Sequence, residues 1–230
     1  MNELRHYASL VGLHLKKELR LEWRRRDTLM GMLFFTLLIA VVFSLAFDPT
    51  SNPTLARQIS GGVGWLGLLF AATTSLNGSW NREERNQVLD AHRLSPSPPS
   101  ALFLGKAIAN FLFVTAVELI LVPVFVLFYN LHTLGDWRLL AAVLPLGTWA
   151  LVLNGTFFAA LSLRGRNRDL LLPMVLFPMS IPALLAMVNA TTSIITGEFD
   201  PMLWVRLLVG YDVVFTTVAL LLFAPVLHAE

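Results

Sequence analysis

Residues 28–47 read TLMGMLFFTLLIAVVFSLAF and contain no charged side chain. About 20 apolar residues, each rising about 1.5 Å along a helix, cross the ~30 Å hydrocarbon core of a bilayer. Asp27 and Asp48 bound the run on its two sides. A secretory signal peptide is the alternative, but its apolar core is usually only about 7–15 residues long. The stretch therefore predicts a membrane-spanning helix.

Five more apolar stretches of similar length follow, which predicts an all-α polytopic membrane protein. Hydrophobic residues make up 56% of the 230 residues and charged residues 14%, whereas soluble domains carry roughly 25% charged residues. The chain has no cysteine, which excludes disulfides, thiolate metal sites and cysteine nucleophiles. The net charge of +2 gives no indication of nucleic-acid binding. The six expected spans cover residues 28–47, 59–80, 102–129, 139–163, 170–191 and 203–227.

Residues 1–26 predict an amphipathic helix that lies on the cytoplasmic membrane surface. Apolar residues recur every three to four positions, and basic residues fill the positions between them. An ordinary basic flank of the first span is the alternative. The apolar positions are Leu4, Tyr7, Val11, Leu15, Leu19 and Trp23, and the basic ones include Lys16, Lys17, Arg20, Arg24, Arg25 and Arg26.

The distribution of Lys and Arg predicts that both ends of the chain lie in the cytoplasm. Cytoplasmic segments of membrane proteins carry an excess of these residues. With the N-terminus inside, the inner segments hold 13 of them and the outer loops two. The inner residues are Arg5, Lys16, Lys17, Arg20, Arg24, Arg25, Arg26, Arg82, Arg85, Arg93, Arg164, Arg166 and Arg168, and the outer ones are Arg57 and Arg138.

Residues 81–100, NREERNQVLDAHRLSPSPPS, form the longest inner loop. Asn81 followed by Glu84 resembles a helix-capping pair, and the prolines after Leu94 end a helix. We therefore expect one helix over residues 82–92 that docks into a groove of a cytoplasmic ATPase. A solvated loop helix is the alternative. The expected coupling residues are Arg82, Glu83, Glu84, Arg85, Val88, Leu89, His92 and Arg93.

Three charged side chains fall within the expected spans, namely Glu118, Arg206 and Asp212. Charged groups at membrane depth are costly and usually face a bundle interior or a cavity. They therefore predict a polar path or coupling site within the membrane. The alternative is a structural ion pair between Arg206 and one of the two acids.

The remaining motifs indicate no enzyme. Residues 62–67 spell G-x-G-x-x-G, but they lie within an apolar span, where glycines allow helices to approach closely. No G-x-x-x-x-G-K-[ST] sequence occurs, so ATP hydrolysis is expected in a separate chain. No metal-binding or catalytic constellation is recognisable.

The chain resembles the haem exporter protein B family (CcmB), the membrane subunit of the cytochrome c maturation ABC system. The features in common are the size, the six spans, the basic N-terminal helix, the charged loop before Leu94-Ser95-Pro96, and Gly105-Lys106-Ala107 opening the third span. The loop departs from the family at Asp90-Ala91-His92-Arg93, where an acidic, leucine-rich run is usual.

The resemblance implies an ABC-2-type permease-like bundle in the bacterial inner membrane. It also implies an ABC ATPase partner, further small membrane subunits, a possible homodimer, and haem as a transported or handled ligand. Two alternatives fit the same sequence. One is an ABC-2-type exporter of drugs or polysaccharides, and the other is a non-transporting membrane scaffold of an assembly complex.

Overall fold

The computed structural model describes the whole chain except residues 1, 25, 96, 132–133, 164–167 and 229–230. Over the described residues the chain forms eight helices and no strand. Arg25, Arg164 and Arg166, which contribute to the charge count above, lie outside the described residues. The helices are α1 (Asn2–Trp23), α2 (Arg26–Phe47), α3 (Pro53–Arg85), α4 (Val88–Arg93), α5 (Pro99–Tyr129), α6 (Trp137–Ser162), α7 (Arg168–Thr196) and α8 (Met202–His228).

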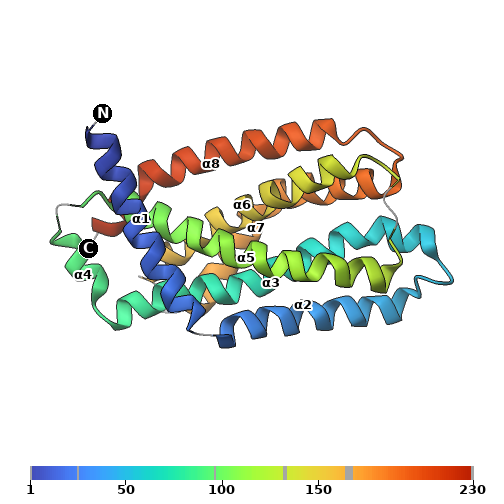
Figure 1. Cartoon of the computed structure of the whole chain (residues 1–230), viewed down its shortest axis with the longest axis horizontal. Helices are drawn as coiled ribbons and strands as arrows, with labels where there is room; N and C mark the ends of the chain where they lie inside the picture. The colour runs from blue at the N-terminus through green and yellow to red at the C-terminus, as the bar shows by residue number, and fades with distance from the viewer. Residues whose placement is uncertain (1, 25, 96, 132–133, 164–167, 229–230) are drawn as a thin grey trace.

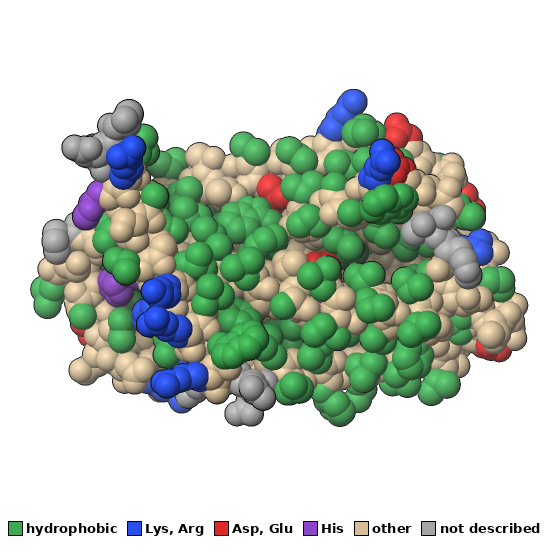
Figure 2. All heavy atoms as spheres, in the orientation of Figure 1, with side chains coloured by type: hydrophobic (Ala, Val, Ile, Leu, Met, Phe, Trp, Pro, Cys, Tyr) green, Lys and Arg blue, Asp and Glu red, His purple; other side chains and the backbone are tan. Residues whose placement is uncertain are grey.

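Six helices of the described chain, α2, α3 and α5 to α8, are long and apolar enough to cross a membrane, as the sequence predicts. They run side by side, and α1, α4 and the C-terminal end of α8 lie at one end of the bundle (Figure 1). Hydrophobic side chains cover the middle of the visible face, whereas Lys and Arg gather towards its two ends (Figure 2). We call the end that carries α1 and α4 the α1 end.

Several spans are longer than expected, α3 and α7 (Arg168–Thr196) most of all. Helix α3 has 33 residues, so it is about 50 Å long and exceeds the ~30 Å hydrocarbon core. It begins at Pro53, because proline needs no hydrogen-bond partner for its nitrogen in the first helical turn. Helix α5 begins in the same way at Pro99. The hydrocarbon thickness bounds the apolar run but does not end the helix, because backbone hydrogen bonding continues into the polar region.

The prediction of a single helix over residues 82–92 is wrong. Helix α3 continues through Arg85, and a turn at Asn86 and Gln87 separates it from the six-residue α4. Gln87 takes a left-handed conformation with φ 54°. Asn81 caps nothing, and its amide contacts Asn77 one turn earlier at 3.4 Å. The capping signature is only a local preference, and here the longer helix places Arg82 and Glu83 beside α1.

Helix α1 forms over almost the whole predicted range and crosses the end of the bundle (Figure 1). It packs directly on α5 at Gly105, where an added Cβ would lie 2.6 Å from the Cβ of His14. The face turned to the bundle includes Val11, Glu18 and Glu22, each at most 9% exposed. Close packing on Gly105 therefore fixes which face of α1 is buried.

The core lies between α3 and its neighbours α6 and α7. Its two large indoles on α3 are both hydrogen-bonded, as buried polar groups usually are. Trp65 Nε1 donates to Thr191 Oγ1 at 2.9 Å, and Trp80 Nε1 donates to the Thr156 carbonyl at 2.8 Å. These bonds hold α3 in register with α7 and α6.

Candidate functional site

Three helices meet at a buried charge cluster at the α1 end. Lys106 of α5 is fully buried, and its Nζ lies 3.0 Å from Glu18 Oε1 of α1 and 3.4 Å from Glu83 Oε1 of α3. Lys17 of α1 pairs with both Glu18 and Glu83. We call Lys17, Glu18, Glu83 and Lys106 the Lys106 cluster. Its two positive and two negative charges balance, which a buried cluster requires.

Further contacts hold Lys106 in place. Its Nζ donates to Ser79 Oγ at 3.1 Å and lies 4.8 Å from the centre of the Trp80 ring. Burial alone would lower the pKa of Lys17, but the neighbouring carboxylates of Glu83 and Glu18 outweigh it and raise that pKa. Lys17 is therefore positively charged at neutral pH, and the contacts of the two lysines with Glu18 and Glu83 join α1, α3 and α5.

Arg82 and Glu83 do not project towards solvent as the expected coupling helix required. Arg82 Nη2 lies 2.7 Å from Glu22 Oε2 of α1. Glu83 is 4% exposed and belongs to the Lys106 cluster. Both side chains therefore bind α3 to α1 within this chain. Of the next two expected residues, Glu84 is half-buried and Arg85 is exposed.

Helix α4 rests on the core and on α8 through two of its side chains. Leu89 packs against the hydrophobic core. Arg93 Nε donates to the Leu227 carbonyl of α8 at 3.0 Å, while Arg93 Nη1 pairs with Asp90 at 2.9 Å. Leu89, an expected coupling residue, therefore contacts the bundle of this chain, and Val88 beside it is half-buried. Leu94, the residue that follows α4, is the apolar side chain that faces outwards, and it is 88% exposed.

A histidine pair joins α4 to α1. The ring centres of His92 and His14 lie 5.1 Å apart. Burial lowers the pKa of both histidines below the ordinary value, and the positive charges of Lys17 and Lys106 lower it further, while Glu83 acts in the opposite sense. Both rings are therefore neutral at neutral pH, which lets them lie together.

The three intramembrane residues do not pair with one another. Glu118 of α5 is 6% exposed and accepts a hydrogen bond from Thr148 Oγ1 of α6 at 2.7 Å. Asp212 of α8 is also 6% exposed, and neither of its carboxyl oxygens has a hydrogen-bond partner among the described residues. Arg206 is exposed and forms no ion pair with any described residue. The alternative of a structural ion pair with Arg206 is therefore wrong.

Sequence reasoning missed three of the buried charges of the site. Glu18, Glu22 and Lys106 were not predicted as site residues. One signal in the sequence pointed to Lys106. It stands seven residues after Pro99, where its helix begins, and most of its neighbours in the sequence are apolar. Such a lysine needs an acidic partner, but the sequence alone does not identify which acid.

Comparison with known proteins shows the family of the chain. The family model described as CcmB protein matches residues 10–229. The chain is 30% identical over 215 residues to the heme exporter protein B of Pseudomonas aeruginosa, covering 93% of this chain and 95% of the relative. It is 33% identical over 190 residues to that of Paracoccus denitrificans, covering 82% and 84%. With its bundle of membrane-spanning helices, this multi-pass membrane protein belongs to the CcmB protein family.

Proposed function

We propose that this chain is the membrane permease subunit of an ABC-type haem export system that serves cytochrome c maturation in the bacterial inner membrane. The observation that carries the proposal is the similarity over nearly the whole chain to relatives named heme exporter protein B. The chain has no P-loop sequence, so a separate ATPase subunit hydrolyses ATP and this chain has no catalytic site of its own.

The α1 end faces the cytoplasm, where the ATPase docks on the outer surface of α4. This orientation follows from the excess of Lys and Arg at that end. Exposed residues of this surface include Arg85, Asp90, Ala91, Arg93 and Leu94. Leu94 is its apolar anchor, because apolar side chains supply most of the binding energy in a contact that is otherwise polar.

Movement of α4 reaches the bundle by two routes. Arg93 connects α4 to the end of α8, and Leu89 connects it to the core. His92 connects it to His14 on α1, and α1 is joined to α3 and α5 through the Lys106 cluster. Closure of the ATPase therefore acts on α8 and α5 together, which favours a shift of the bundle between two arrangements.

The remaining partners follow from the same family. Further small membrane subunits and a second copy of this chain would pack on the lipid-facing helices. Helix α2, the first of the six long apolar helices, has a highly exposed apolar face. Phe34 is 67% exposed and Leu45 is 80% exposed. Such a face suits lipid or another membrane helix.

Two experiments test the proposal. The first is deletion of the gene, which should abolish covalent c-type cytochromes and leave b-type cytochromes intact. Normal c-type cytochromes in the deletion strain would overturn the assignment to haem export.

The second experiment tests the docking surface. Leu94→Asp should release the ATPase during purification, because losing one buried leucine contact costs about 1.5–3 kcal/mol, or roughly 10- to 100-fold in affinity. Leu134→Asp is the matched control, since Leu134 is 62% exposed and follows α5 at the opposite end of the bundle. If both variants retain the ATPase equally, α4 is not the docking surface.

A further inference from the structure

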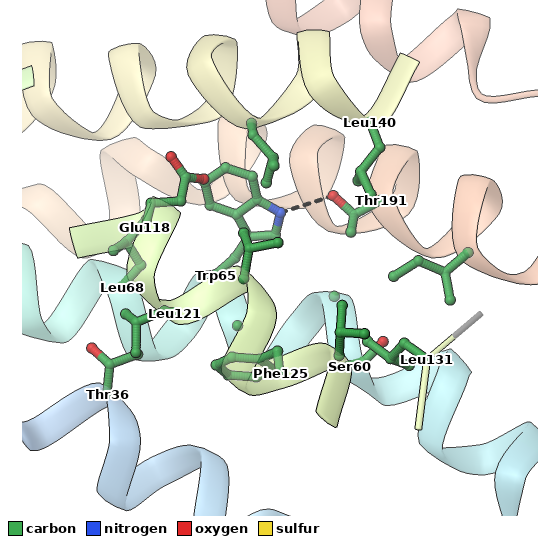
Figure 3. A pocket seen from close by; sticks show the side chains of 16 residues that line it. Thr36, Ser60, Trp65, Leu68, Glu118, Leu121, Phe125, Leu131, Leu140 and Thr191 are labelled. Atoms are coloured by element: carbon green, nitrogen blue, oxygen red, sulfur yellow. Dashed lines mark hydrogen bonds between the residues drawn. The ribbon is translucent and has the colours of Figure 1, made fainter. Parts of the chain in front are cut away.

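A cavity of about 490 Å³ lies in the half of the bundle away from the α1 end. Helices α2, α3, α5, α6 and α7 all contribute to its walls. Its volume falls in the range of about 300–1,000 Å³ that is typical of small-molecule pockets. Figure 3 shows the ring of Trp65 between Glu118 on one side and Thr191 on the other, with Phe125 opposite.

The walls are apolar and aromatic apart from a few polar groups. The indole nitrogen of Trp65 is already bonded to Thr191, so its ring serves only as an apolar, electron-rich surface. Gly64 of α3 leaves room beside the Phe125 ring, since an added Cβ would lie 3.7 Å from that ring. Aromatic faces of this kind attract organic cations as well as apolar chains.

Glu118 is the one acidic residue among the described residues that line the cavity. Thr148 donates a single hydrogen bond to it, and no described residue forms an ion pair with it. An ionised carboxylate at membrane depth needs a counter-charge. Because the described part of the chain supplies none, the counter-charge has to come from a proton or from a bound cation.

The chemistry of the walls favours an organic cation over a metal ion. Hard metal cations take about six oxygen ligands, whereas Glu118 supplies the only carboxylate in the described lining. The described lining also contains no Lys, Arg or His, so it has nothing to pair with an anionic head group. A neutral lipid tail would fill the space but would leave Glu118 to be neutralised by a proton alone.

We propose that this cavity binds a lipophilic amine, with its ammonium group against Glu118 and its hydrocarbon chain along Trp65 and Phe125. The site depends neither on haem nor on an ATPase, so it stands or falls separately from the function proposed above. An alkyl ammonium ion satisfies the carboxylate, and its chain covers the apolar walls.

The test uses the full chain in lipid nanodiscs with photoreactive probes. Three dodecyl probes carry the same diazirine and differ only in the head group, which is a primary amine, an alcohol or a carboxylic acid. Mass spectrometry of the cross-linked peptides identifies the labelled helices. The amine should label the cavity segments of α3 and α5, unlabelled dodecylamine should compete with it, and the acid should label them at least about tenfold less, because the cavity wall carries a like charge.

Three variants separate the cavity from general lipid contact. Glu118→Gln should reduce labelling by the amine at least about tenfold, because it removes the buried negative charge that pairs with the ammonium group and keeps the shape of the side chain. Gly64→Leu should reduce labelling by all three probes because it fills the cavity. Asp212→Asn is the matched control, since it removes another buried intramembrane carboxyl outside the cavity and should leave labelling by the amine unchanged.

The outcomes divide as follows. Equal labelling by all three probes in the wild-type chain would show an ordinary lipid-tail site and would overturn the proposal. So would amine labelling that survives Gly64→Leu. If Glu118→Gln fails to fold, the preference of the wild-type chain for amine over acid and the loss of labelling in Gly64→Leu still decide the question.

Discussion

Replacing Lys106 tests whether the buried charge cluster holds α1 on the bundle. Lys106→Met keeps a similar side-chain volume but removes the positive charge that faces Glu18 and Glu83. Those two carboxylates are at most 6% exposed, and Lys17 is then their only remaining partner in the cluster. We therefore expect α1 to separate from the bundle more readily.

The size of the effect follows from the burial of the partners. Removing one partner of a buried ion pair typically costs about 3–5 kcal/mol. Lys17 still compensates part of the negative charge, but its side chain is 36% exposed and its pairing is screened by solvent. We therefore expect the lower end, about 3 kcal/mol, which corresponds to roughly a 100-fold increase in the population of the opened state.

The assay uses the absence of cysteine in the natural chain. Val11→Cys places one thiol on the face of α1 that packs on α5, where Val11 is 9% exposed. The rate of thiol labelling in the folded protein then reports how often α1 opens. Lys106→Met should raise this rate roughly 100-fold, while Lys16→Met, at an exposed position on the same helix, should change it little.

A double variant supplies the decisive comparison. Lys106→Met combined with Glu18→Gln leaves the single pair of Lys17 and Glu83, so the charges balance again. This variant should recover most of the lost stability. A labelling rate in Lys106→Met within tenfold of the wild-type rate, or an equal rate in the single and double variants, would refute the argument from charge balance.

Three further predictions concern topology, acidity and helix packing. In cells, an impermeant thiol reagent should label Asn52→Cys from outside but not Asn86→Cys, both positions being exposed. Acidification should loosen α1, because the lowered pKa values of His14 and His92 mean that the opened state binds protons more readily. The contact between His14 and His92 is therefore complete above the ordinary histidine pKa of about 6.5 and weakens as the pH falls below it. The thiol-labelling rate of Val11→Cys measures this loosening. Gly105→Ala should also loosen α1, by about 1–3 kcal/mol, because the new methyl group meets the helix.

Each of these predictions has its own control. Labelling of Asn86→Cys from outside would reverse the predicted orientation. His92→Gln should make the opening of α1 less sensitive to pH, and an unchanged pH profile would contradict the role of the pair. Gly12→Ala lies on α1 with nothing within 4 Å of the added carbon, so it should not loosen the helix, and equal effects of the two alanines would exclude the steric explanation.

The number and nature of the spans could be predicted from the sequence because they depend on local composition. A run of about 20 apolar residues has to cross the bilayer wherever it lies in the fold. The same reasoning identified Glu118 and Asp212 as buried, since an acid inside such a run has to avoid lipid. The partner of Glu118 was not predictable, because Thr148 contacts it only through the way α5 packs on α6.

The coupling loop shows where a local signal fails. The capping pair at Asn81 and Glu84 is a real preference worth about 1 kcal/mol. It was outweighed because continuing α3 brings Arg82 to Glu22 and Glu83 to Lys106. Such contacts join residues far apart in the chain, and no window of neighbouring residues contains them.

The sequence alone therefore determined that this protein spans a membrane, roughly where its spans lie, and which of its ends is richest in positive charge. Only the tertiary structure decided that α1 turns Glu18 and Glu22 inwards, that Leu89 faces the core and Leu94 faces out, and that Lys106 joins three helices. The physical reason is the distance along the chain over which each effect acts. Hydropathy acts residue by residue, whereas the burial of a charge depends on which opposite charge the packing of other helices brings within a few ångströms of it.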